Sequence, residues 1–191
     1  MSELLHWDQH WFEWINGPGH TAWLDIIMPW WREKTSWIPL YVLLAAYLVW
    51  TYRMKAVPFL LAIGLLIGLA DSLSSQVVKP AVERLRPCND PALRAEVQLL
   101  IPCGVGYSFT SSHATNHFAL AMFMALTLPL FRGWRGGLLF LWAGSIAYGQ
   151  VYVGVHYPLD VLAGAVLGLL CGALITWAYR SLPEHYQIEK S

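Results

Sequence analysis

Residues 159–179 read LDVLAGAVLGLLCGALITWAY, and this run decides the fold because it is apolar almost throughout. Its one charged residue, Asp160, stands at the start. An apolar run this long matches the ~20 residues that a membrane-spanning helix needs. Four further runs have the same character, and they cover residues 37–52, 57–78, 114–131 and 138–152. We therefore predict five spanning helices.

The composition of the whole chain is that of an integral membrane protein. Of its 191 residues, 57% are hydrophobic and 13% are charged, whereas a soluble domain has roughly 25% charged residues. The 11 tryptophans suit the aromatic belts of membrane interfaces. The net charge is zero, so no nucleic-acid partner is predicted. We predict one domain over residues 1–191, an all-α polytopic transmembrane bundle at 36–180 that follows an N-terminal segment at 1–35.

The N-terminal segment differs from the predicted spans. In LLHWDQHWFEWI, residues 4–15, the apolar side chains share one helical face and polar ones lie opposite. The apolar face consists of Leu4, Trp7, Trp11, Trp14 and Ile15. This pattern predicts a helix that lies in the membrane interface. Two glycines and two prolines interrupt residues 17–31, so we predict no span there, and a sixth span in this stretch is the alternative.

The basic residues outside the predicted spans give the topology. With five spans, three pairs fall on one side of the membrane: Arg53 and Lys55, Arg132 and Arg135, and Arg180 and Lys190. The positive-inside rule assigns that side to the cytoplasm. The N-terminal helix, the connection at 87–112 and His156 then lie outside. We expect a multi-pass protein of the inner (cytoplasmic) membrane whose site faces the periplasm or the exterior.

Three polar clusters fall on the predicted outer side, and the first is KPAVERLRP at residues 79–87. Lys79 and Arg86 are seven residues apart, which is two helical turns, so they are expected to share a face. Two cations on one face can bind a phosphate. The alternative is a pair of basic residues whose charged ends reach the interface without any ligand.

The second cluster is YSFTSSHATNHF at residues 107–118, where Ser111 and Ser112 stand at the start of a predicted helix. Serine caps helix N-termini, and the free N–H groups there bind anions. His113 lies in the first turn beside them. A simple helix cap with a hydrogen-bonded histidine is the alternative.

The third cluster is His156, Pro158 and Asp160. A carboxylate within reach of a histidine fixes its tautomer and leaves the other ring nitrogen free to act. Taken together, the clusters hold two cations, a helix N-terminus, two histidines and an orienting carboxylate. This set suits phosphate transfer, in which one histidine attacks phosphorus and the other protonates the leaving oxygen.

These motifs are Lys-x6-Arg-Pro at 79–87, Ser-x-His at 111–113 and His-x3-Asp at 156–160. In this order they resemble the type 2 phosphatidic acid phosphatase superfamily, over residues 57–179. The resemblance implies a membrane lipid phosphatase that acts on a phosphomonoester or diphosphate, such as phosphatidic acid, phosphatidylglycerophosphate, undecaprenyl diphosphate or a lipid A phosphate. It also implies that the reaction uses no metal and no other cofactor.

The resemblance assigns a role to each motif residue. Lys79 and Arg86 would bind the phosphate, and Ser111 and the backbone of Ser112 would hydrogen-bond it. His113 would be the general acid. His156 would be the nucleophile that forms a phosphohistidine, and Asp160 would orient it.

The chain departs from the family pattern at two places. Ser112 stands where the family usually has glycine, and Gly149-Gln150 stands where it usually has Ser-Arg. Glutamine can donate a hydrogen bond to phosphate but carries no charge. We therefore expect Gln150 to contact the phosphate and Arg94 to supply the missing cation. Arg94 is preferred to Arg84 because Arg84 is predicted to point off the face shared by Lys79 and Arg86.

Three other functions are compatible with parts of the sequence. His113 and His117 have the spacing of a zinc-binding helix, but the glutamate of that motif is replaced by Ala114. A serine hydrolase would use the same residue types, but the Gly-x-Ser-x-Gly turn is missing. The third is a non-catalytic lipid-phosphate-binding or scaffold member of the family, and Gln150 is the one sequence feature that supports it.

The chain has three cysteines, and two of them fall in the predicted outer connection. In an oxidising periplasm Cys88 and Cys103 can form a disulfide, closing a loop of about 15 residues for roughly 3 kcal/mol of stability. Two unpaired thiols are the alternative. Cys171 lies within a predicted span and is expected to stay reduced.

Overall fold

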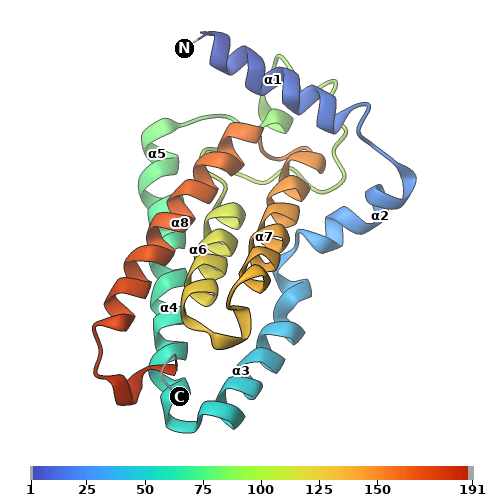
Figure 1. The fold of residues 1–191 in the computed structure, drawn as a ribbon. Helices are drawn as coiled ribbons and strands as arrows, with labels where there is room; N and C mark the ends of the chain where they lie inside the picture. The colour runs from blue at the N-terminus through green and yellow to red at the C-terminus, as the bar shows by residue number, and fades with distance from the viewer. Residues whose placement is uncertain (1, 189–191) are drawn as a thin grey trace.

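The computed structural model describes residues 2–188, which form helices joined by loops and contain no β-strand in that range. The predicted all-α class is confirmed; Lys190 lies outside the described residues. The helices are α1 (Ser2–Asn16), α2 (Ala22–Trp31), α3 (Ile38–Tyr52), α4 (Ala56–Ser72), α5 (Lys79–Val82), α6 (Ser112–Thr127), α7 (Trp134–Tyr152) and α8 (Pro158–Arg180) (Figure 1). Single 3₁₀ turns lie at Lys34–Trp37, Arg53–Lys55, Pro87–Asn89, Pro129–Phe131 and Glu184–Tyr186.

Helix α6 forms the centre of the bundle and packs against α8, α7 and α4. It approaches α8 closely because glycines recur every four residues on the facing side of α8. A Cβ atom added at Gly164 would lie 2.6 Å from the Ser111 carbonyl oxygen, and one at Gly172 would lie 2.7 Å from that of Ala119. Small residues at this spacing let two backbones meet. The N-termini of α6 and α8 are therefore held side by side.

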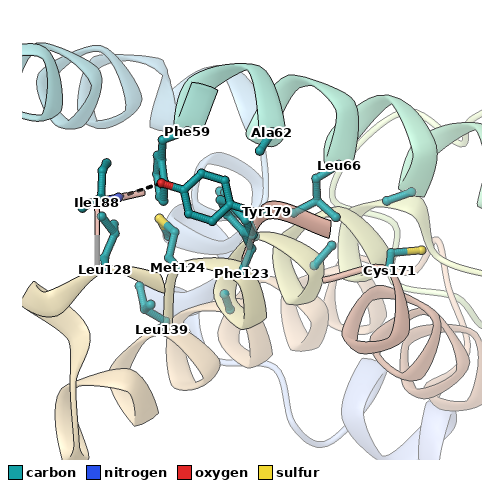
Figure 2. Packing of buried hydrophobic residues seen from close by; sticks show 14 of the residues in the cluster. Phe59, Ala62, Leu66, Phe123, Met124, Leu128, Leu139, Cys171, Tyr179 and Ile188 are labelled. Carbon is teal, nitrogen blue, oxygen red and sulfur yellow. Dashed lines mark hydrogen bonds between the residues drawn. The ribbon is translucent and has the colours of Figure 1, made fainter. Parts of the chain in front are cut away.

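A second set of contacts closes the other end of the bundle, and its members come from α3, α4, α6, α7, α8 and the C-terminal residues (Figure 2). Phe59 packs against the rings of Phe123 and Tyr179. The Tyr179 hydroxyl accepts a hydrogen bond from the backbone N–H of Ile188, 2.8 Å away. This core fixes α4, α6 and α8 relative to one another and so supports the polar end of the bundle.

Helix α1 lies across that polar end, beside the start of α8 (Figure 1). Asp8, Phe12 and Asn16 are buried against the protein, and Ile15 is partly buried there. The exposed large apolar side chains of α1 are Leu4, Leu5, Trp7, Trp11 and Trp14. The Asn16 amide donates hydrogen bonds to the carbonyl oxygens of Tyr152 and Gln98, at 2.8 and 2.9 Å. Apart from Ile15, the predicted apolar face of α1 therefore points away from the bundle, as expected of a helix in the membrane interface.

Two helical stretches within the described residues are long and apolar enough to cross a membrane, Lys34–Asn89 and Pro158–Arg180. Helix α2 has ten residues, so it is about 15 Å long and too short for a bilayer core of ~30 Å. The connections between α3 and α4 and between α6 and α7 lie at the end opposite α1 (Figure 1). These connections carry the predicted cytoplasmic arginines. The five-span topology remains a prediction.

The prediction that Lys79 and Arg86 share a helical face was wrong. Helix α4 continues through a π-helical stretch, Leu73–Val78, into the single turn of α5. The helix ends there because Glu83 adopts a left-handed conformation with φ of 54°. Arg86 is extended, as is usual before a proline. A folded-back loop therefore carries Arg86.

Candidate active site

A polar cavity of about 400 Å³ lies where the end of the α4–α5 segment, the start of α6 and the start of α8 meet. It collects residues from all three motifs, which are far apart in the sequence. The lining consists of Ser75, Lys79, Pro80, Arg86, Val105, Gly106, Tyr107, Ser112, His113 and His156. The structure thus brings five of the predicted site residues to one place.

His156 and Asp160 lie in the cap that starts α8. Tyr157 is the N-cap residue and Pro158 is the first helical position. Asp160 is then the third helical position, where the side chain of a capping box accepts a hydrogen bond from the N-cap backbone N–H. Its Oδ2 accepts from the backbone N–H of Tyr157 at 2.9 Å and lies 3.4 Å from Nδ1 of His156. Nδ1 therefore carries the proton. Nε2 keeps its lone pair and lies 3.3 Å from Nη1 of Arg86.

Burial lowers the pKa of His156 to about 4, although its contact with Asp160 works in the opposite direction. The positive charges of Arg86 and Lys79 lower the pKa further. The ring is therefore neutral at pH 7. A neutral ring with its proton on Nδ1 offers the Nε2 lone pair as a nucleophile.

The two cations of the first motif reach the cavity from different backbone segments. Nζ of Lys79 donates to the carbonyl oxygens of Tyr107 and Ser108, at 3.2 and 3.1 Å. Nη1 of Arg86 donates to that of Val155 at 3.1 Å, and its Nε has no partner. Neither cation forms a salt bridge with a carboxylate of residues 2–188. The cavity is therefore cationic and suited to an anion.

The N-terminus of α6 contributes the second motif. Ser111 is the N-cap residue, and its Oγ accepts from the N–H of Ala114 at 3.4 Å. Ser112 has its Oγ 2.9 Å from the hydroxyls of both Ser74 and Ser75, on the π-helical stretch. Ser111 is fully buried and does not line the cavity, so of the two serines in this motif Ser112 is the one that faces it.

The two histidines of α6 have different surroundings. His113 lines the cavity, and its Nε2 lies 3.4 Å from Nη2 of Arg32. Both ring nitrogens of His117 have partners: Nδ1 lies 2.7 Å from the carbonyl oxygen of His113 and Nε2 lies 3.3 Å from the hydroxyl of Tyr41. His117 therefore has a structural role within α6 and α3. His113 is the histidine that faces the site.

Two residues expected at the phosphate are not among the cavity-lining residues. Gln150 is fully buried within α7, and neither its amide nitrogen nor its amide oxygen has a hydrogen-bond partner. Arg94 is exposed in the connection before α6. Cys88 and Cys103 in the same connection are joined by a disulfide, and Cys171 is free and buried.

Sequence reasoning missed a chain of charges that links α1 to the site. Asp8 has a fully buried side chain whose Oδ2 accepts from Nη2 of Arg84 at 2.6 Å. Nη1 of Arg84 donates to Oδ1 of Asp160 at 2.9 Å, and its guanidinium lies 3.8 Å above the ring of Tyr157. The spacing of Asp8, Phe12 and Asn16, four residues apart, was the available signal for a second buried face of α1.

The family model of the PAP2 superfamily matches residues 55–183, which include every residue of the three motifs. The chain belongs to the PAP2 superfamily. The resemblance inferred from the motifs is thus confirmed. The PAP2 match begins at the end of the α3–α4 connection, so Asp8 and Arg32 lie outside it.

Individual PAP2 proteins are similar over more of the chain. The lipid A 4'-phosphatase of Bacteroides thetaiotaomicron is 33% identical over 172 residues, which cover 88% of this chain and 75% of the relative. The crystal structure of Aquifex aeolicus LpxE superposes with a TM-score of 0.65 at 29% identity, covering 87% of this chain and 93% of that one.

A second crystal structure shows that the whole PAP2 fold is shared. It is the first transmembrane PAP2 type phosphatidylglycerolphosphate phosphatase from Bacillus subtilis, with a TM-score of 0.73 at 22% identity. The match covers 96% of this chain and 90% of that one. At this identity the likeness shows the fold alone; the two helical stretches long and apolar enough to cross a membrane support a membrane protein.

Proposed function

We propose that this protein is a membrane lipid phosphatase that hydrolyses a lipid phosphomonoester or diphosphate through a phosphohistidine on His156, without a metal ion. Membership of the PAP2 superfamily supports the reaction class. One observation carries the lipid specificity: the cationic cavity adjoins an apolar groove, and Ser112 and His113 line both.

The apolar groove has a volume of about 400 Å³ and runs between α3, α4 and α6. Its walls are aliphatic and aromatic, formed by Tyr41, Leu44, Ala45, Leu48, Leu60, Ile63, Ile67 and Leu120. Lys34, Asp71, Asn116 and His117 add polar groups to the lining, which also includes Ser112 and His113. A lipid whose phosphate occupies the cationic cavity can therefore place a hydrocarbon chain in the groove.

The proposed reaction has two displacements at phosphorus. In the first, Nε2 of His156 attacks phosphorus, the phosphorus–oxygen ester bond breaks, and the leaving oxygen takes a proton from His113, whose ring takes up that proton when the anionic substrate binds beside it. In the second, a water oxygen attacks phosphorus while His113 accepts a proton from that water. The phosphorus–nitrogen bond then breaks and releases phosphate. Asp160 holds the Nδ1 proton of His156 throughout.

The cations and the α6 terminus stabilise the charge that develops on the phosphate oxygens. Lys79 and Arg86 would face those oxygens, together with the backbone N–H of Ser112. Ser111 would act by holding the helix cap that aims these groups. Lipid A phosphates are the first substrates to test because a similar protein is a lipid A 4'-phosphatase; phosphatidic acid, phosphatidylglycerophosphate and undecaprenyl diphosphate follow.

We place the site on the outer face of the inner membrane, with five spans. The α3–α4 and α6–α7 connections, which include Arg53 and Arg132, lie at the end opposite α1 (Figure 1), which favours a cytoplasmic position for that end. The disulfide between Cys88 and Cys103 lies in the connection that lines the cavity end. Disulfides persist in oxidising compartments, so it supports a periplasmic or exterior position.

Phosphate release from these four lipids by the purified protein, in excess chelator, tests the proposal. Wild-type protein should release phosphate from at least one lipid, and His156→Ala should release none. Brief reaction with a ³²P-labelled substrate should leave an acid-labile label on His113→Ala but not on His156→Ala. Wild-type release by His156→Ala would refute the mechanism, and lipid binding without any release would favour the non-catalytic alternative.

A further inference from the structure

Arg32 is a buried cation without a carboxylate partner. It follows α2 directly, and 9% of its surface is exposed. Its Nε has no hydrogen-bond partner, and no carboxylate of residues 2–188 forms a salt bridge with it. The contact of its Nη2 is with Nε2 of His113, at 3.4 Å. Arg32 is not itself among the cavity-lining residues but lies against His113, which is. Burying an unpaired guanidinium is costly, so its position behind His113 needs an explanation.

Gly149 of α7 shapes the space that Arg32 occupies. A Cβ atom added at Gly149 would lie 3.2 Å from the Cβ of Arg32, which is closer than an ordinary contact. Gln150, the next residue, is buried away from the cavity and carries no charge. Arg32 therefore lies against the part of α7 at which this chain has no cation of its own.

Arg32 and Arg86 are close enough for their charges to interact. Burial lowers the pKa of Arg32, the neighbouring Glu33 opposes that effect, and the positive charge of Arg86 lowers the pKa further. Both guanidinium groups also have an unpartnered Nε. Two buried cations that repel each other, with hydrogen-bond donors left unused, are the arrangement expected of an anion site before its anion binds.

We propose that Arg32 binds the phosphate of the substrate, beside His113, and so supplies the cation that Gln150 does not. The assignment rests on the proposed function, because it places a third positive charge at the same phosphate as Lys79 and Arg86. Three cations suit a dianionic phosphomonoester better than a singly charged diester. In the structure Nη2 of Arg32 donates to the lone pair on Nε2 of His113; a bound phosphate oxygen would replace that acceptor.

Two matched pairs of variants test the assignment. Arg32→Ala is compared with Arg94→Ala, which removes an exposed arginine outside the cavity lining. Gly149→Ala is compared with Gly144→Ala in the same helix, because a Cβ at Gly144 would meet nothing within 4 Å. The measurements are kcat/KM on a short-chain lipid phosphomonoester and the dissociation constant of inorganic phosphate by titration calorimetry. Thermal melting in detergent checks that each variant folds.

Arg32→Ala should lower kcat/KM about tenfold to a hundredfold, as the loss of one charge-assisted hydrogen bond does, and should weaken phosphate binding. Added methylguanidinium should restore part of the activity. Arg32→Lys keeps the charge but not the two-pronged donor, so it should lose less than Arg32→Ala. Gly149→Ala should lose several-fold by displacing Arg32, whereas Gly144→Ala and Arg94→Ala should behave as wild type.

Wild-type kcat/KM and phosphate affinity in Arg32→Ala would overturn the assignment while leaving the role of His156 intact. If no lipid is hydrolysed by wild-type protein, the proposed function fails, and the phosphate titration still decides the role of Arg32 because it needs no turnover. If Arg32→Ala does not fold, the decision falls to Arg32→Lys and the two glycine variants. Equal phosphate affinity in all of those would overturn the assignment.

Discussion

Replacing Asp8 by asparagine tests whether α1 holds the partner of the nucleophile in place. In the structure Asp8 accepts two hydrogen bonds, from Nη2 of Arg84 at 2.6 Å and from the backbone N–H of Leu159 at 2.7 Å. Arg84 in turn donates to Asp160. Asparagine has the same size and keeps one oxygen for Leu159. Its amide nitrogen, however, turns a donor toward Arg84, so one side of the guanidinium loses its anchor.

The expected loss can be estimated from the burial of the two groups. The side chain of Asp8 is fully buried and that of Arg84 is 18% exposed. A hydrogen bond to a charged group is worth about 1.5–3 kcal/mol, so Asp8→Asn should destabilise the fold by about 2–3 kcal/mol. For a chain of this length that lowers Tm by roughly 4–12 °C. Because Arg84 then holds Asp160 less firmly, kcat should fall by up to about tenfold.

The assay compares Asp8→Asn with Glu13→Gln, which makes the same chemical change on an exposed position of α1. Thermal melting gives the change in stability, and steady-state kinetics on a short-chain lipid phosphate separates kcat from KM. Because Asp8 does not line the cavity, kcat should fall while KM stays within about twofold. If Asp8→Asn melts and turns over like Glu13→Gln, the link from α1 to Asp160 has no functional importance.

Three further predictions follow from other parts of the structure. The pKa of His156 in the folded protein, about 4, lies below its ordinary value of 6.5, so the unfolded chain takes up a proton first as the pH falls. The free energy of unfolding should therefore be constant above pH 6.5 and decrease toward pH 4. In a pH–rate profile, the acid limb of kcat/KM should lie near pH 4. Replacing Cys88 and Cys103 together by serine should cost roughly 3 kcal/mol of stability, and thiol labelling of the denatured, unreduced protein should modify Cys171 alone. Gln150→Leu should melt no lower than wild type, because both polar atoms of the buried amide lack partners; a tenfold loss of kcat/KM would instead show that the amide contacts the substrate.

The long helices could be predicted from the sequence because apolar length is a local property. The predicted span at 159–179 corresponds to α8 at Pro158–Arg180, and that at 138–152 lies within α7 at Trp134–Tyr152. The meeting of the three motifs was also predictable. The charge pattern placed Lys79, His113 and His156 on one side of the membrane, and the structure lines one cavity with them.

Contacts between distant parts of the chain could not be predicted in this way. Arg32 and His113 are separated by 81 residues, and Asp8 and Leu159 by 151. No periodic pattern in the sequence identifies the partner residue in either contact. The end of α5 was missed for a different reason. The seven-residue spacing of Lys79 and Arg86 suggested one continuous helix, but the left-handed turn at Glu83 ends it, and a loop returns Arg86 to the cavity.

The N-terminal segment has a composition that packing alone does not explain. A helix that merely lay on the membrane would need no buried charge, and apolar side chains of similar size would be at least as stable at buried positions. Yet this segment buries both Asp8 and Arg32. Burial raises the pKa of Asp8 and lowers that of Arg32, so each charge is held at a cost in free energy. Departures from good packing are expected at functional sites. Asp8 anchors Arg84, which holds the Asp160 that orients His156, and Arg32 lies beside His113. The N-terminal segment therefore supports both histidines of the site, although it lies outside the PAP2 match.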